Sequence, residues 1–431
     1  MRIRKIKFRD DVLLGSLELN FLNFSTGKPY ENVVFVGENG VGKTTVLSLL
    51  KHFLKRPERC YFYNYVEYEI HDIVYSFERI TERADGSTQI NFRDVTNNQV
   101  WLLGGLVDED YPDEGNPNRQ NSIFSFSRND NVEENEHNFD EIIERLKSLQ
   151  EEDCINYVYH NIKHPDSTKE WADFFETSKM HTFAKAFNNF FDNMTYFGMG
   201  FDHDKKKVIG FTKYGHEIPT SFLSSGEKQI IERAVPFLEQ MNDEKDNLCL
   251  IDEPEISLHP KWQAKIFSFY KDLFLDIDGK QQNQIIMASH SSSLLKEALA
   301  HPEDTLVIRL KDVNGLIEAQ RIEHPTYLGH ITYAEVNYLV FGIPTPEYHN
   351  QLYCEIQNRF NKCKVKKCDE FIVAHPTYNS AIHGKISTYG TTTYHSLSSY
   401  IRNAIDHYDN GHDFTEEELV TSIKLMQEIL R

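Results

Sequence analysis

The stretch VVFVGENGVGKTT, residues Val33 to Thr45, determines the fold of this chain. A short hydrophobic run typical of a strand leads into the glycine-rich segment Gly37 to Thr44, and a helical segment, Val46 to Leu54, follows it. In this context, backbone N–H groups wrap around a polyphosphate at the positive end of a helix. The stretch therefore predicts a phosphate-binding loop between a strand and a helix.

The residue types in this loop assign its chemistry. Glycines at 37, 40 and 42 let the backbone approach the phosphates closely, and Lys43 is placed to reach the β and γ phosphates. Thr44 offers its hydroxyl to Mg²⁺. We expect a nucleoside triphosphate with Mg²⁺ to bind here.

Composition limits the remaining possibilities. The chain has 431 residues, of which 40% are hydrophobic and 13% aromatic, which is enough for two or three domains with sizeable cores. The formal charge of -20 disfavours a general basic coat for duplex DNA. No apolar run is long enough to span a bilayer and the N-terminus does not resemble a signal peptide, so we expect a cytoplasmic protein without membrane association.

Six scattered cysteines do not indicate a disulfide framework in a chain of this kind. Cys363 and Cys368, with Cys354 upstream, provide half of a zinc site, but no second pair with suitable spacing completes it.

Alternation and composition divide the first half of the chain. Residues 3–8 and 15–21 alternate as strands do, and residues 61–105 predict a small antiparallel β-subdomain. Residues 107–139 predict an acidic, turn-rich loop, either a docking surface or simply a solvated insertion. Residues 139–195 return to helical periodicity, with aromatic residues expected to form a subdomain core.

Three further stretches carry polar residues next to predicted strands or helices. After a predicted hairpin at 206–218, SFLSSGEKQII spans residues 221–231. NLCLIDE, residues 247–253, is a buried strand ending in two carboxylates, and IIMASHSSSLL, residues 285–295, is another apolar strand followed by a histidine.

Together these stretches resemble the head of an ABC-class ATPase. GENGVGKT at 37–44 is similar to a Walker A motif, LSSGE at 223–227 to the ABC signature, and LCLIDE at 248–253 to a Walker B strand with its catalytic glutamate. Leu258-His259 falls where a D-loop would be, and His290 matches the switch histidine. The sequences DEPEISLHPKWQ and ASHSSSLL are most similar to those of the RecF, SMC and OLD branch. The interval between the Walker A motif and the signature is too short for a long coiled-coil arm.

The resemblance implies ATP as cofactor with Mg²⁺, and it implies roles for individual residues. Glu253 would polarise the attacking water, His290 would sense the γ phosphate, and Thr44 and Asp252 would serve the magnesium. The residues implied to contact nucleotide are Gly37, Asn39, Gly40, Gly42, Lys43, Thr44, Thr45, Ser224, Ser225, Gly226 and Glu227. The Q-loop glutamine is not assigned. Because the signature serves the nucleotide of a second protomer in this class, the resemblance implies a homodimer through the ATPase heads.

The last hundred residues form a separate helical region. Lysines 362, 364, 366 and 367 stand out on an otherwise acidic chain, and Thr415 with Glu418 predicts a capping box for a final amphipathic helix. Arg402-Asn403-x3-His407 resembles the R-x4-H motif of HEPN-type ribonucleases. That resemblance implies that Arg402 and His407 are catalytic toward RNA. The alternative is a helical dimerisation module in which Arg402 pairs with Asp406 at i+4.

The expected fold is therefore an α/β ABC-type P-loop head over residues 1–325, with a β-subdomain and a helical subdomain and insertion at about 107–220. An all-α, HEPN-like domain follows at 326–431. The arrangement resembles PrrC and RloC anticodon nucleases, and the head resembles ATPase subunits of Septu, PARIS and retron-type anti-phage systems.

Two functions follow from these resemblances. Either the ATPase gates its own C-terminal ribonuclease, acting on tRNA-like RNA in abortive infection, or it is a scaffold that holds and releases a separately encoded partner nuclease. DNA repair of the RecF kind is less favoured, because no basic surface is evident.

Overall fold

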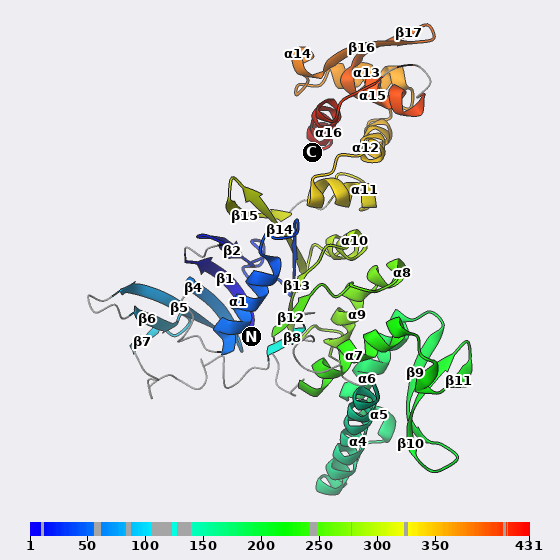
Figure 1. Cartoon of the computed structure of the whole chain (residues 1–431). Helices are drawn as coiled ribbons and strands as arrows, with labels where there is room; N and C mark the ends of the chain where they lie inside the picture. Colours follow the sequence, from blue (N-terminus) through cyan, green and yellow to red (C-terminus); the bar gives the residue numbers. More distant parts are fainter. Residues whose placement is uncertain are drawn as a thin grey trace. The chain divides into compact units, whose positions relative to one another are not determined.

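The computed structural model of the chain describes residues 1–9, 13–55, 62–82, 88–104, 123–126, 139–240, 248–276, 278–322, 326–407, 411 and 413–431. These residues form two compact units, Met1–Arg321 and Ile322–Arg431, and Figure 1 labels most of their helices and strands.

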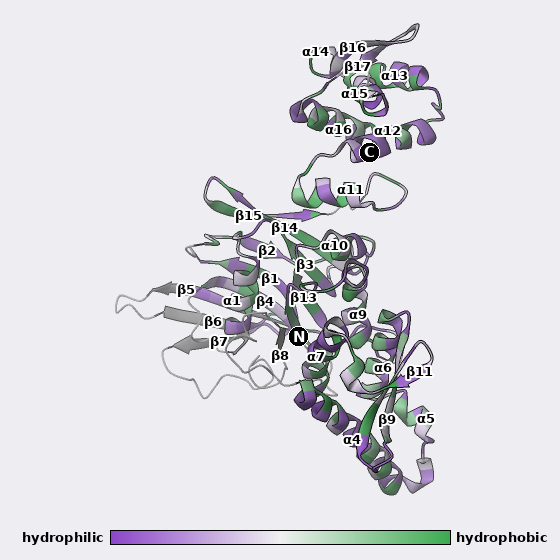
Figure 2. Cartoon of the chain, turned by 45° about the vertical axis from the view of Figure 1, so that its right-hand side comes forward, coloured by the Kyte–Doolittle hydropathy of each residue, from purple (hydrophilic) through white to green (hydrophobic). Residues whose placement is uncertain are grey.

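A six-stranded sheet forms the centre of the first unit, in the order β15-β14-β3-β13-β12-β8. Its strands are β3 (Asn32–Val36), β8 (Ile123–Phe126), β12 (Leu248–Asp252), β13 (Gln284–Ala288), β14 (Thr305–Val313) and β15 (Leu316–Ile322). The five strands from β14 to β8 pair in parallel. All residues of β3, β12 and β13 are buried, as expected for parallel strands covered on both faces, and Figure 2 colours β3 and β13 mainly as hydrophobic.

Strand β8 corrects one prediction. Composition predicted an acidic loop over residues 107–139, but residues 123–126 pair in parallel with Leu248–Ile251 of β12. Their sequence, IFSF, lacks the charges of its flanks and suits a strand beside a buried neighbour. Phe139 already begins helix α4, and the remainder of the predicted loop lies outside the described residues.

A second six-stranded sheet has the order β2-β1-β4-β5-β6-β7. Its strands are β1 (Arg2–Phe8), β2 (Glu18–Asn20), β4 (Tyr63–Ile70), β5 (Ile73–Glu82), β6 (Thr88–Asp94) and β7 (Gln99–Gly104). All neighbouring strands are antiparallel, which confirms the predicted antiparallel subdomain at 61–105.

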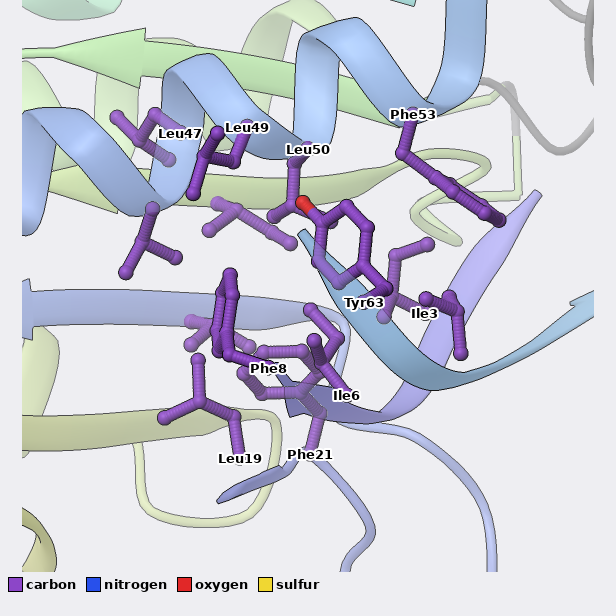
Figure 3. Packing of buried hydrophobic residues seen from close by; sticks show 14 of the residues in the cluster. Ile3, Ile6, Phe8, Leu19, Phe21, Leu47, Leu49, Leu50, Phe53 and Tyr63 are labelled. Atoms are coloured by element: carbon purple, nitrogen blue, oxygen red, sulfur yellow. The ribbon is translucent and has the colours of Figure 1, made fainter. Parts of the chain in front are cut away.

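Helix α1 (Lys43–Lys55) packs against this second sheet through its apolar face. Figure 3 shows Leu50 and Phe53 on the side of the helix that faces the strand residue Tyr63. The Phe53 and Tyr63 rings lie 5.3 Å apart, and those of Phe8 and Tyr63 lie 5.1 Å apart. Truncating a buried leucine such as Leu50 typically costs about 2–5 kcal/mol. This packing fixes the helix whose first residue is Lys43.

The region after β8 is helical and then forms a small sheet. Its helices are α4 (Phe139–Lys163), η3 (Pro165–Ser167), α5 (Trp171–Phe175) and α6 (Lys179–Phe190). They are followed by β9 (Met194–Phe201), β10 (Lys207–Lys213), β11 (His216–Ile218) and η4 (Thr220–Phe222). The predicted helical segment and the predicted hairpin are both confirmed, and β9 adds a third strand to that hairpin.

Four helices complete the first unit around the central sheet: α7 (Ser225–Gln240), α8 (Pro260–Gln263), α9 (Ile266–Leu273) and α10 (Ser292–Leu299).

The second unit is mostly helical. Its helices are α11 (Tyr333–Val336), the π-helix η5 (Asn337–Phe341), α12 (Pro346–Arg359), α13 (Val365–Val373), α14 (Ser380–His383), α15 (Leu397–Asp406) and α16 (Glu416–Leu430). The predicted capping box of the last helix is confirmed, because the Thr415 side chain accepts from Glu418 N and Glu418 caps Thr415 N.

An antiparallel hairpin, β16 (Gly384–Tyr389) and β17 (Thr392–Ser396), makes the prediction of an all-α domain wrong. Tyr389 pairs with Thr392 across a two-residue turn. The threonine- and tyrosine-rich sequence of β17 favours an extended backbone, and Gly390, with φ +59°, supplies a turn residue.

None of the helices in the described part of the chain is both long enough and apolar enough to cross a membrane.

Candidate functional site

The sheet order brings three of the predicted motifs to one edge. Strand β13 lies between β3 and β12, and all three run in the same direction. Phe35, Ala288 and Asp252 occupy one register across the three strands. The carboxyl ends of parallel strands in an open sheet are where ligands bind, and here they carry the phosphate loop, the carboxylate pair and the histidine.

The phosphate loop requires glycine at its first and last glycine positions. Gly37 has φ +148° and a Cβ there would lie 2.4 Å from the backbone oxygen of Leu310. Gly42 has φ +89° and a Cβ there would lie 2.6 Å from Leu14 Cδ2. These two positions give the loop a shape that other residues would prevent. The loop therefore fits a phosphate cradle.

The Lys43 ammonium is held inside the loop. It donates to the carbonyl oxygens of Gly37, at 3.0 Å, and Glu38, at 2.9 Å. Burial lowers the pKa of Lys43, while the nearby carboxylates of Glu253 and Asp252 act in the opposite direction. A cation that is partly desolvated in this way is a strong partner for an anion that enters the loop.

The other predicted residues of the loop are positioned by the same turn. Gly40 has φ +86°, a Cβ there would meet no heavy atom within 4 Å, and Asn39 beside it is exposed. Thr44 and Thr45 lie in the first turn of α1, where backbone N–H groups are not used by the helix.

Asp252 ends β12 and lies beside Thr44. Burial raises the pKa of Asp252, and a hydrogen bond with the Thr44 side chain opposes that shift. Its Oδ1 atom is buried and has no hydrogen-bond partner among the residues that the structure describes. Mg²⁺ is commonly held by one or two protein oxygens together with phosphates and water. The unsatisfied carboxylate oxygen and the adjacent hydroxyl fit that need.

Glu253 and His290 face each other from two neighbouring strand ends. His290 Nε2 lies 3.3 Å from Glu253 Oε1, and both side chains are about a third exposed, at 31% and 30%. Glu253 has φ +49°, a left-handed conformation that is uncommon for a residue other than glycine and clusters at functional sites. Burial, followed by the Lys43 charge, lowers the pKa of His290.

Glu255 is a residue of this site that sequence reasoning missed. Its Oε1 atom accepts from Ser289 Oγ at 2.7 Å, His290 N at 2.7 Å and Ser291 N at 3.1 Å. The carboxylate thereby fixes the backbone that carries His290. A third acid two residues after the Asp-Glu pair was the available sequence signal.

Arg233 is a second missed residue, and no sequence signal pointed to it. Its guanidinium donates to the carbonyl oxygen of Pro254 and, at 2.9 Å, to that of Ile256. It lies on α7, the helix that begins at the signature.

The signature residues lie at the start of α7, with Ser224 directly before its first residue, Ser225. Ser224 N donates to Glu227 Oε2 at 2.8 Å, and Lys213 Nζ donates to Glu227 Oε1 at 2.8 Å. The Glu227 carboxylate, predicted to contact nucleotide, is thus buried and engaged in capping its own helix. A Cβ at Gly226 would lie 2.6 Å from Trp262 Cζ3, so glycine is required there for close packing on α8.

No described hydrogen bond or ion pair joins Ser224, Ser225, Gly226 or Glu227 to the phosphate loop. The structure therefore brings the Walker A, Walker B and switch residues together. The described hydrogen bonds and ion pairs do not connect the signature residues to the phosphate loop.

The second unit places both residues of its predicted site around the end of α15. Arg402 pairs with Asp406 at 2.7 Å and donates to Asn403 Oδ1 at 3.0 Å. His407 stacks on Tyr389, with ring centroids 4.3 Å apart, and its Nδ1 lies 3.2 Å from the Tyr389 hydroxyl. The Asp406 contact is the one expected for a structural role of Arg402.

Comparison with known proteins gives three kinds of match. A family model described as "AAA domain, putative AbiEii toxin, Type IV TA system" matches residues 33–296. The Septu protein PtuA of Bacillus thuringiensis is 26% identical over 313 residues, which cover 66% of this chain and 71% of PtuA.

Solved structures of SMC heads also align. The SMC head domain from Thermotoga maritima gives a TM-score of 0.39 at 15% identity and covers 75% of this chain and 100% of that chain. The SMC head bound to the C-winged helix domain of ScpA gives a TM-score of 0.42 at 12% identity, with 75% and 98% covered.

Proposed function

From the membership of this chain in the family of AAA domains associated with AbiEii toxins of type IV toxin–antitoxin systems, we propose that it hydrolyses ATP and uses the nucleotide to control a toxic nuclease activity in anti-phage defence. The observation that carries the proposal is the meeting of Lys43, Asp252, Glu253 and His290 at one edge of the central sheet. A phosphate cradle, a cation, a candidate metal ligand and a carboxylate beside a histidine are the parts that phosphoryl transfer to water needs.

Each residue of the site has a separate role in ATP hydrolysis. The loop amides and Lys43 hold the β and γ phosphates of ATP, and Thr44 and Asp252 hold Mg²⁺. The metal ion, when bound, neutralises charge that develops on the phosphate oxygens. Glu253 orients the attacking water and accepts its proton. His290, which follows β13, senses the γ phosphate.

The signature supports a homodimer. Ser224 precedes α7 and Ser225 begins it, and no described hydrogen bond or ion pair joins either residue to the phosphate loop of the same chain. In the dimer, the start of α7 from one protomer completes the nucleotide site of the other. Two ATP molecules then lie at an interface with two-fold symmetry.

The first candidate for the nuclease activity is the second unit of this chain. Arg402 and His407 lie at the end of one helix, with the Arg402 side chain 25% exposed, and this placement suits a metal-independent attack on RNA by its own 2′-hydroxyl. The ATPase dimer would gate this activity.

A separately encoded nuclease is the second candidate. Asp406 already neutralises Arg402, Tyr389 covers one face of His407, and the chain is similar to the Septu protein PtuA. Under this alternative the chain is a scaffold that binds the nuclease and releases it.

One experiment separates these proposals. Wild type, Glu253→Gln and the double variant Arg402→Ala/His407→Ala are each incubated with total cellular RNA and Mg-ATP, and phosphate release and RNA fragments are recorded. Cleavage by wild type that is lost in the double variant, with phosphate release retained, supports the gated ribonuclease. Phosphate release without RNA cleavage by any variant supports the scaffold. Absence of phosphate release from wild type contradicts the ATPase itself.

A further inference from the structure

The turn that follows β12, residues Glu253 to Leu258, is held in a strained conformation and is here named the Walker B turn. Glu253 has φ +49° and Ser257 has φ +64°, and neither is glycine. Such conformations are unfavourable and persist only where surrounding contacts impose them. The direction of the Glu253 side chain therefore depends on whatever holds this turn.

Arg233 holds the turn from the signature helix. It is 6% exposed and projects from α7. Its two guanidinium arms donate to the carbonyl oxygens of Pro254 and Ile256, on either side of Glu255 and between the two strained positions. The fork geometry of arginine fixes both carbonyl groups at once, which a single ammonium cannot do.

Glu255 links the Walker B turn to the backbone around the switch histidine, His290. Its carboxylate is buried, at 6% exposed, and binds the backbone N–H groups of His290 and Ser291 together with the Ser289 hydroxyl. Hydrogen bonds to a buried charged group are stronger than those between neutral groups. A shift of the Walker B turn would thus move the backbone of His290 as well.

A second route closes the network. Gln263 on α8 donates to the carbonyl oxygen of Leu258, at 3.0 Å, and accepts from Ser291 Oγ, at 2.9 Å. Trp262, beside it, packs against Gly226 at the start of α7. The signature, the Walker B turn and the switch are therefore linked both through Arg233 and through α8.

We infer that Arg233 and Glu255 are positioning residues that transmit the engagement of the signature helix to the Glu253–His290 pair of the same protomer. The inference rests on the proposed ATPase dimer and deepens it. ATP bound by one protomer contacts the signature of the other, and through Arg233 it sets the catalytic pair of that second protomer. Each site thereby prepares the opposite one, which predicts positive cooperativity between the two ATP molecules.

The test compares Arg233→Met with Arg145→Met as a matched control. Arg145 also forms side-chain hydrogen bonds to a residue of α7, Glu239, at 2.6 Å from Nε to Oε1, but it touches neither the Walker B turn nor the switch in the described contacts. Steady-state phosphate release is measured as a function of ATP concentration, and binding of a fluorescent ATP analogue is measured separately.

For Arg233→Met we expect kcat to fall about 10- to 100-fold, because small misplacements of a catalytic group have effects of this size. We expect the affinity for the analogue to change less than about 3-fold and the Hill coefficient to drop from above one to one. Arg145→Met should match wild type in all three quantities. Glu255→Ala should repeat the Arg233→Met result, and Glu255→Gln, which keeps an acceptor oxygen, should restore part of kcat.

Equal kcat and Hill coefficient in wild type and Arg233→Met would overturn the inference while leaving the ATPase proposal intact. If Arg233→Met does not fold, Arg233→Lys decides. It keeps the charge but reaches only one carbonyl, so the inference requires reduced kcat with retained binding, and wild-type kcat and cooperativity refute it. A wild-type protein that releases no phosphate refutes the ATPase proposal and this inference together.

Discussion

Nε2 of His290 and Oε1 of Glu253 lie 3.3 Å apart across the ends of β13 and β12. This contact joins the predicted sensor of the γ phosphate to the predicted catalytic carboxylate. Its strength depends on the protonation of His290, since a protonated imidazole would form an ion pair with Glu253 and reduce the carboxylate's capacity to accept a proton.

This dependence gives a pH profile. Burial and the Lys43 charge lower the pKa of His290 from its usual value of 6.5, so the side chain is neutral at pH 7. As the pH falls through that lowered pKa, protonation should reduce kcat/KM, which reports groups of the free enzyme. We expect an acidic limb below pH 6.5 in wild type and its loss in His290→Asn. An unchanged limb in His290→Asn would assign it to another group.

Packing at the signature makes a second prediction. Gly226→Ala places a methyl group 2.6 Å from Trp262 Cζ3, and overpacking of this kind typically costs about 1–3 kcal/mol. We expect a lower denaturant midpoint with an unchanged slope. Gly200→Ala is the matched control, because a Cβ at Gly200 meets no heavy atom within 4 Å. Equal destabilisation by the two substitutions would show that the contact with Trp262 has no energetic role.

The second unit should lose stability in acid because of His349. This side chain is fully buried on α12, its Nε2 lies 2.9 Å from Ser422 Oγ, and burial lowers its pKa to about 3. The folded-state pKa is thus below the unfolded value of about 6.5. The contribution of neutral His349 is fully present above pH 6.5 and is lost progressively as the pH falls toward 3, by about 1.4 kcal/mol per pH unit.

His349→Leu tests this prediction. Between pH 6.5 and pH 4, the free energy of unfolding of the variant should fall less steeply than that of wild type. It is measured by denaturant titration of the full chain, with a spectroscopic probe in the second unit. His395→Leu, an exposed histidine on β17, should retain the wild-type pH dependence. The same slope in wild type and His349→Leu would contradict the assignment.

The sequence was sufficient to predict elements whose signal is local. Strand β3, the glycine loop and α1 follow from hydrophobicity and glycine spacing, and the Thr415 capping box follows from two residues three positions apart. The proximity of Asp252, Glu253 and His290 also follows from each ending or following a buried strand, once those strands are parallel neighbours.

Contacts between elements distant in sequence were not predictable in this way. In the sequence, Arg233 is one charged residue among several on an amphipathic helix. Only the folded structure shows that it donates to the carbonyl oxygens of Pro254 and Ile256. Glu227 was predicted to contact nucleotide because of its place in the signature, but its carboxylate is used by Ser224 and Lys213. Strand β8 was missed because four uncharged residues were averaged with charged flanks.

The central claim, that this edge of the sheet binds and hydrolyses ATP, is tested most directly by measuring ATP binding and phosphate release in parallel. Wild type, Glu253→Gln and Lys43→Ala are compared at saturating Mg-ATP. We predict that Glu253→Gln binds ATP as wild type does but releases phosphate about 10²–10⁴-fold more slowly, and that Lys43→Ala loses binding. Phosphate release by Glu253→Gln at the wild-type rate, or wild-type binding of ATP by Lys43→Ala, would contradict this account.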